Sequence, residues 1–146
     1  MKTRLIVYWI ATGLTAFVFL SGGVVDILRP APALAGMRQL GYPDYFMVIL
    51  GVWKVLGGVA VLAPRWPRVK EWAYAGMLFD LTGATASHAS TGDSVRHIVT
   101  PMIILAIVVV SWALRPQSRR LGELCCYKSP GDDVGHAAGE GTSPAV

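Results

Sequence analysis

The chain has 146 residues, of which 53% are hydrophobic and only 15% are charged, and its formal net charge at pH 7 is +4. A soluble domain carries roughly 25% charged residues, so this deficit indicates a chain whose solvent is partly lipid. A net positive charge can indicate a nucleic-acid partner, but the basic residues here stand at the ends of apolar runs rather than in one patch. That placement is typical of membrane orientation, and we expect no nucleic-acid binding.

Four apolar runs are long enough to cross a bilayer, which takes about 20 residues. They cover residues 5–25, 45–63, 72–90 and 97–114. The connections between them are rich in the Pro, Gly and charged residues that end helices, as in PAPALAG, GYPD, PRWPRVKE and TGDS. The sequence therefore predicts an all-α fold, an integral membrane four-helix bundle that occupies residues 1–115.

The basic residues also predict the orientation of this bundle. Nine Lys and Arg residues fall on the side that holds the N-terminus, the 64–71 connection and the C-terminal tail, and three fall on the other side. By the positive-inside rule we expect a multi-pass protein of the cell inner membrane with both termini in the cytoplasm. Ala33-Leu34-Ala35 resembles a signal cleavage site, but the first apolar run is longer than a signal core of roughly 7 to 15 residues, so we expect a retained span.

The apolar pattern ends with the fourth run. Residues 116–146 are rich in Gly, Ser, Pro and Ala and offer little to bury, which predicts a disordered cytoplasmic tail. Cys125 and Cys126 lie within it. Adjacent cysteines rarely form a structural disulfide, and no second pair completes a metal site, so we interpret them as reduced thiols of unassigned role.

Two charged residues lie deep within the predicted spans. Lys54 is about 13 Å from the cytoplasmic end of its span and Asp80 about 12 Å from the cytoplasmic end of the next, at 1.5 Å per residue. An unpaired lysine at that depth costs on the order of 2.5–3.5 kcal/mol on insertion scales. Because the two depths match on adjacent antiparallel spans, we expect Lys54 and Asp80 to form a buried ion pair.

Small residues flank both members of this predicted pair. Gly51 and Gly58 share a helical face with Lys54, and Gly76 and Gly83 share one with Asp80. Small residues let helices approach closely in a membrane, so we expect a glycine-lined seam between the two spans. Two interpretations of the pair stay open: a structural pin that fixes helix register, and a proton or ligand site.

Further polar residues gather toward the predicted outer surface. They are Asp26, Ser87, His88 and Asp93, and they predict a polar cluster at the mouth of a vestibule. We predict no metal site, because neither a His-x-x-x-His nor a Glu-x-x-His spacing occurs, and we interpret His97 as an interfacial start to the last span.

Most aromatic residues stand near span ends, where an amphipathic ring prefers the interface. Trp53 is the exception, because it lies deep in its span beside Lys54. Its position fits either core packing or the wall of a pocket for a flat ligand.

The stretches LSGGVVDIL, LGYPDYF, ILGVWKVLGG, PRVKEWAYAG and FDLTGATASH resemble the DoxX-like family of small bacterial four-span membrane proteins. The resemblance covers roughly residues 5–115 and implies a compact helical bundle. Relatives are associated with a thiosulfate:quinone oxidoreductase or with redox stress and thiol maintenance in the membrane. Because the predicted spans of this chain contain no cysteine, we do not carry thiol chemistry over.

The function we expect is that of a non-enzymatic accessory subunit or partner of a membrane redox system. Its partners would be the lipid bilayer and either a second copy of the chain or a redox-complex subunit, and no cofactor is predicted. The alternative is a small-molecule or quinone-binding or transport protein that uses Lys54 and Asp80. A quinone-linked enzyme ranks last, because no metal or flavin motif that could carry electrons is visible.

Overall fold

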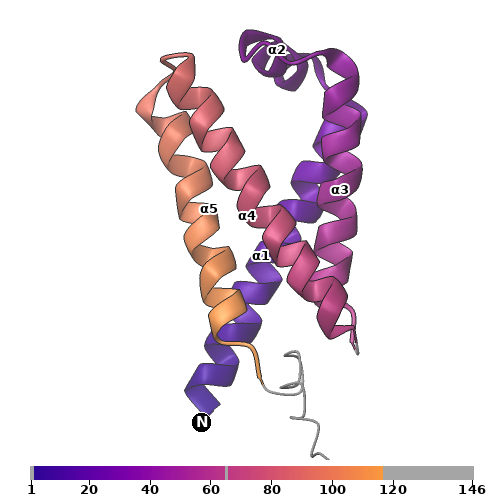
Figure 1. Cartoon of the computed structure of the whole chain (residues 1–146), viewed down its shortest axis with the longest axis vertical. Helices are drawn as coiled ribbons and strands as arrows, with labels where there is room; N and C mark the ends of the chain where they lie inside the picture. Colours follow the sequence, from indigo (N-terminus) through magenta and orange to yellow (C-terminus); the bar gives the residue numbers. More distant parts are fainter. Residues whose placement is uncertain (1, 65, 117–146) are drawn as a thin grey trace, which may run out of the picture.

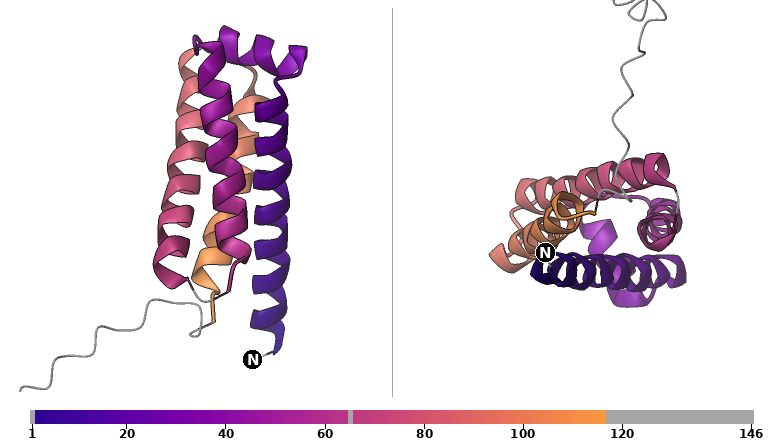
Figure 2. Two further views of the ribbon diagram at one scale, coloured as in Figure 1. Left: turned by 90° about the vertical axis from the view of Figure 1, so that its right-hand side faces the viewer. Right: turned by 90° about the horizontal axis from the view of Figure 1, so that it is seen from below.

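The computed structural model describes residues 2–64 and 66–116, and this part of the chain folds into α-helices without a strand. The helices are α1 (Lys2–Leu28), α2 (Ala31–Gln39), α3 (Asp44–Leu62), α4 (Pro67–Ser90) and α5 (Val95–Ala113). The four long helices lie side by side and alternate in direction, and α2 lies across the end away from the N-terminus (Figures 1 and 2). The predicted all-α fold is confirmed. The predicted tail, with Cys125 and Cys126, lies outside the described residues apart from Pro116.

Three of the long helices, α1, α3 and α5, are long and apolar enough to cross a membrane, with mean hydropathies of 1.8, 2.0 and 1.9. Helix α4 has 24 residues, which is also a sufficient length, but its polar and charged residues keep it out of this group. Each of the four helices still exposes large apolar side chains, among them Phe17, Trp53, Phe79 and Ile103. Apolar surface of this extent is typical of an interaction with lipid or with partner helices.

Helix α2 was not predicted, because the sequence analysis interpreted PAPALAG only as a connection. Pro30 precedes the helix and Pro32 lies in its first turn. Proline is tolerated there because the first N–H groups of a helix have no intrahelical acceptor. At its other end Arg38 Nε donates a hydrogen bond of 2.8 Å to Asp44 Oδ1, which ties α2 to the start of α3.

The core lies among the four long helices. Its buried side chains are Phe19, Val61, Tyr74, Met77, Leu81 and Val108. A hydrogen-bonded group of hydroxyls adds to it: Ser111 Oγ lies 2.8 Å from Thr12 Oγ1 and 2.7 Å from the hydroxyl of Tyr74. This group joins α1, α4 and α5 near the end of the molecule that holds the N-terminus, and it satisfies polar groups that would otherwise be buried without partners.

Candidate functional site

Lys54 of α3 lies between two carboxylates that come from different helices. Its Nζ is 2.8 Å from Asp26 Oδ2 on α1, to which it donates a hydrogen bond, and 3.9 Å from Asp80 Oδ2 on α4. The three side chains are partly buried, with exposed fractions of 23% for Lys54, 17% for Asp26 and 15% for Asp80. One cation thus faces two carboxylates, and the nearer of them is one that sequence reasoning had assigned to the outer polar cluster.

The glycine-lined seam runs between α1 and α3, and not between α3 and α4 as the sequence analysis expected. A Cβ added to Gly51 would lie 2.7 Å from the backbone oxygen of Gly23, and one added to Gly58 would lie 2.9 Å from Leu20. By contrast, a Cβ at Gly76 or Gly83 on α4 would meet nothing within 4 Å. The close approach needs glycine on both facing helices, and α1 supplies Gly23 where α4 supplies no counterpart.

This seam explains why Asp26 is the closer partner of Lys54. Asp26 lies beside Gly51, since a Cβ on that glycine would come within 2.9 Å of the Asp26 Cβ. Gly51 stands one helical turn before Lys54 on α3, and the lysine stem is long enough to cover that turn. The depth of the Lys54 Cα along its span does not show how far the side chain reaches, so the contact with Asp26 was not predicted.

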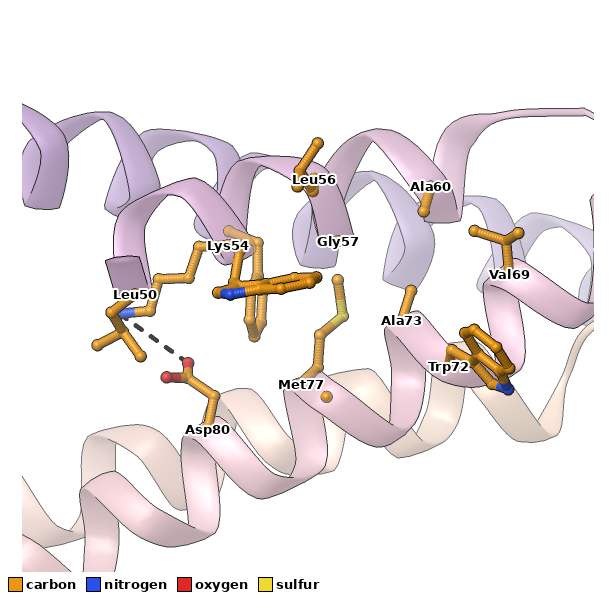
Figure 3. A pocket seen from close by; sticks show the side chains of 13 residues that line it. Leu50, Lys54, Leu56, Gly57, Ala60, Val69, Trp72, Ala73, Met77 and Asp80 are labelled. Atoms are coloured by element: carbon orange, nitrogen blue, oxygen red, sulfur yellow. Dashed lines mark ion pairs between the residues drawn. The ribbon is translucent and has the colours of Figure 1, made fainter. Parts of the chain in front are cut away.

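A pocket of about 410 Å³ lies between α3 and α4 beside this ionic group. Figure 3 shows that Leu50, Lys54 and Asp80 stand at one end of it and Val69 and Trp72 at the other. Its wall is otherwise apolar and includes Phe19, Trp53, Leu56, Ala60, Ala73 and Met77. Trp53, for which packing and a pocket wall were both open, lines the pocket with 69% of its surface exposed.

The pocket combines an apolar body with a single charged end. Ligand pockets are typically about 300–1,000 Å³ and mostly apolar, with a few polar groups that orient the ligand. Here the Lys54 ammonium can donate hydrogen bonds and the Asp80 carboxylate can accept them, so a ligand oxygen or hydroxyl can be held at that end. The exposed ring of Trp72, 78% of whose surface is accessible, stands at the opposite end.

The residues predicted to form one outer polar cluster are divided among three groups. Asp26 belongs to the ionic group with Lys54. Ser87 Oγ forms a hydrogen bond of 2.7 Å with the hydroxyl of Tyr42, which precedes α3. His88 and Asp93 lie together at the α4–α5 turn, where His88 Nδ1 is 2.8 Å from Asp93 Oδ2.

His97, which the sequence predicted only as an interfacial start to the last span, also joins this turn. Its Nδ1 lies 3.0 Å from the same Asp93 oxygen, so one carboxylate contacts both imidazoles. Hydrogen bonds from the Ser94 backbone N–H, from His88 and from His97 lower the pKa of Asp93 to about 2. The available signal was that Asp93 and His97 are only four residues apart at the start of α5, where the chain turns into the helix.

These features define an all-α membrane protein with a polar group in the middle of its helices and an apolar pocket beside it. Residues 10–111 match the DoxX-like family, and the chain belongs to that family, as the resemblance predicted. The "Uncharacterized protein YdgD" of Bacillus subtilis (strain 168) is similar, with 26% identity over 96 residues that cover 66% of this chain and 83% of that protein. No solved structure matches.

Proposed function

We propose that this protein binds a small lipophilic molecule in the pocket between α3 and α4, with Lys54 and Asp80 holding the polar end of that molecule. The single observation that carries the proposal is the shape of the pocket, whose one charged end adjoins an apolar body of ligand size. The proposed activity is binding, without turnover by this chain.

The position of the charged end favours a particular class of ligand. Lys54 lies near the middle of α3, and the pocket extends from it toward Val69 and Trp72 near the start of α4. A phospholipid keeps its headgroup at the membrane surface, so it does not match a polar end at mid-helix depth. A small molecule with a flat ring and a carbonyl or hydroxyl group, such as a quinone, matches both the depth and the aromatic wall.

The proposal includes four membrane spans, with both ends of the helical region on the cytoplasmic side of the inner membrane. Helix α4 would be the most polar span, and its Asp80 carboxylate lies 3.9 Å from the Lys54 ammonium. The test is single-cysteine labelling with a membrane-impermeant thiol reagent in a Cys125→Ser/Cys126→Ser background. The Thr91→Cys variant should react from outside intact cells, and the Pro64→Cys variant should react only after the membrane is opened. Labelling of both positions from outside would contradict four spans.

Binding can be tested by titrating the purified protein in detergent with a short-chain quinone analogue and following tryptophan fluorescence. Trp53 and Trp72 line the pocket, so an aromatic acceptor bound there should quench them in a saturable manner. Ala60→Phe should abolish saturable quenching because Ala60 lines the pocket, whereas Val59→Phe adds the same ring at an exposed neighbouring position outside it. Equal quenching in both variants would contradict the proposal.

The second candidate is the accessory subunit of a membrane redox system. It is favoured by the exposure of Trp53 and Trp72, which line the pocket between α3 and α4 and could receive a helix of another subunit. Gentle extraction from native membranes, followed by identification of co-purifying proteins, tests it. A heteromer that Trp72→Ala disrupts and Trp9→Ala preserves would favour this role, and recovery of the lone protein in every preparation would count against it.

A further inference from the structure

We propose that His88, Asp93 and His97 form a binding site for a divalent transition-metal ion at the α4–α5 turn. This site lies at the end of the molecule away from the N-terminus and is separate from the pocket between α3 and α4 (Figure 1). The three side chains offer ligand atoms that all lie within 4.8 Å of one another. Two imidazole nitrogens and one carboxylate oxygen form a donor set that suits zinc and its neighbours in the first transition row.

The distances fit coordination by the atoms that face each other. Asp93 Oδ2 lies 2.8 Å from His88 Nδ1 and 3.0 Å from His97 Nδ1. Metal–ligand bonds of about 2.0–2.1 Å place neighbouring ligand atoms roughly 2.9–3.4 Å apart. The carboxylate oxygen is therefore already close to the required distance from each nitrogen, and the two imidazoles, whose ligand atoms lie within 4.8 Å of one another, would draw together around the ion. Binding would displace any proton on the nitrogens that face the carboxylate.

The turn holds the carboxylate in place before any ion arrives. The Ser94 backbone N–H donates a hydrogen bond of 2.6 Å to Asp93 Oδ1, which leaves Oδ2 facing the two imidazoles. Gly92, with φ of +65°, provides the left-handed backbone conformation that reverses the chain between the helices. His88 and Asp93 are mostly shielded, with 24% and 15% of their side chains exposed, whereas His97 is 57% exposed and leaves a path for an ion.

The competing role is a hydrogen-bonded staple, in which both imidazoles donate to Asp93 and no ion binds. The two roles differ in their response to metal. A metal site is stabilised by the ion and loses affinity when any ligand is removed, whereas a staple loses stability in the same variants and is indifferent to the ion.

The test uses the full chain with a tag that contains no histidine, in a Cys125→Ser/Cys126→Ser/His136→Gln background, because those side chains could bind zinc themselves. Zn²⁺ affinity is measured by competition with a chromophoric chelator for the background protein and for His88→Gln, Asp93→Asn and His97→Gln. We expect saturable binding of one ion, a raised melting temperature with Zn²⁺, and affinity at least roughly tenfold weaker in each variant.

His97→Gln is the decisive variant, because its exposed side chain can be replaced with little risk to folding. Arg96→Gln is the matched control at the neighbouring position, and it should retain the affinity of the background protein. Absence of saturable binding would overturn the proposal. So would binding that any one of the three ligand variants leaves unchanged.

Discussion

Asp26 lies 2.8 Å from Lys54 across the glycine seam between α1 and α3, and Asp80 lies 3.9 Å from the same ammonium on the other side. The two carboxylates therefore hold the lysine at different distances and in different surroundings. Asp80 borders the pocket between α3 and α4, and Asp26 does not line it. The two carboxylates therefore have different roles. Asp26, the nearer one, holds the Lys54 ammonium and contributes mainly to stability, whereas Asp80 also lines the pocket and can contribute to ligand binding.

Replacing each carboxylate in turn should separate these two roles. Asp26→Asn weakens a charge-assisted hydrogen bond, so we expect it to lower the free energy of unfolding by on the order of 1–3 kcal/mol. Asp80→Asn should cost less, because Lys54 keeps its closer partner. Denaturant unfolding in detergent measures both values. A larger loss of stability for Asp80→Asn than for Asp26→Asn would contradict the assignment.

The close approach of α1 and α3 should make Gly51 intolerant of any side chain. Gly51→Ala places a methyl group 2.7 Å from the backbone oxygen of Gly23, so the helices must separate, at a cost of about 1–3 kcal/mol. Gly83→Ala on α4 is the matched control, since its methyl group meets nothing within 4 Å. That control should be neutral or stabilising by up to about 1 kcal/mol, as expected of alanine in a helix. Thermal unfolding in detergent should rank the two variants in this order, and equal effects would argue against a tight seam.

Ser111 should be more important to stability than an exposed serine. Ser111→Ala removes the shared partner of the Thr12 and Tyr74 hydroxyls, which lie in buried surroundings. An unsatisfied buried hydroxyl costs about 1–3 kcal/mol, so we expect a loss of that order. Ser21→Ala makes the same chemical change at an exposed position whose hydroxyl bonds only within its own helix, and it should have little effect. Unfolding midpoints that do not differ between the two variants would show that the hydroxyl group is dispensable.

The turn between α4 and α5 should be sensitive to acid through Asp93. The pKa of Asp93 is lowered to about 2 from its ordinary value of 3.8, chiefly by the Ser94 backbone N–H and then by His88 and His97. Because the folded state lowers this pKa, its stabilising contribution is complete above 3.8 and is lost as the pH falls through about 2. The melting temperatures of the wild type and Asp93→Asn should therefore converge over this interval, measured without added metal.

Ser90→Ala provides the control for this pH dependence, because it removes an exposed hydroxyl without changing a charge. Its difference from the wild type should stay constant over the same interval. A gap between wild type and Asp93→Asn that is equally constant would contradict the role of the ionised carboxylate.

The helices could be predicted from the sequence because an apolar run of bilayer length is a strong local signal. α3 and α5 begin and end within two residues of the predicted spans, whereas α1 and α4 extend beyond them. Helix α2 was missed because its prolines are typical of connections, although both fall where a helix tolerates them. The spaced glycines of α3 and α4 have similar patterns in the sequence. Those of α3 form a close contact only because α1 faces them, whereas no helix in the described part of the chain approaches Gly76 or Gly83 as closely.

The site was harder to predict than the helices, because it also depends on which helices face each other. Depth along neighbouring spans suggested Asp80 as the partner of Lys54, but it could not rank that residue against Asp26, because the ranking depends on which helix α3 approaches most closely. His97 was interpreted only as an interfacial start to the last span, because neither a His-x-x-x-His nor a Glu-x-x-His spacing occurs in the sequence. His88 and His97 come from different helices and both contact Asp93 in the turn between them. A spacing rule for residues on one helix does not predict such an arrangement.

The pocket between α3 and α4 is proposed to hold a small lipophilic molecule at Lys54 and Asp80. Native mass spectrometry of the protein gently extracted from its own membranes tests this most directly, with Ala60→Phe and Val59→Phe as the paired variants. We expect a bound small molecule of defined mass on the wild type and on Val59→Phe. It should be lost in Ala60→Phe and weakened in Asp80→Asn. The same adducts on all four proteins, or none on the wild type, would contradict the proposal.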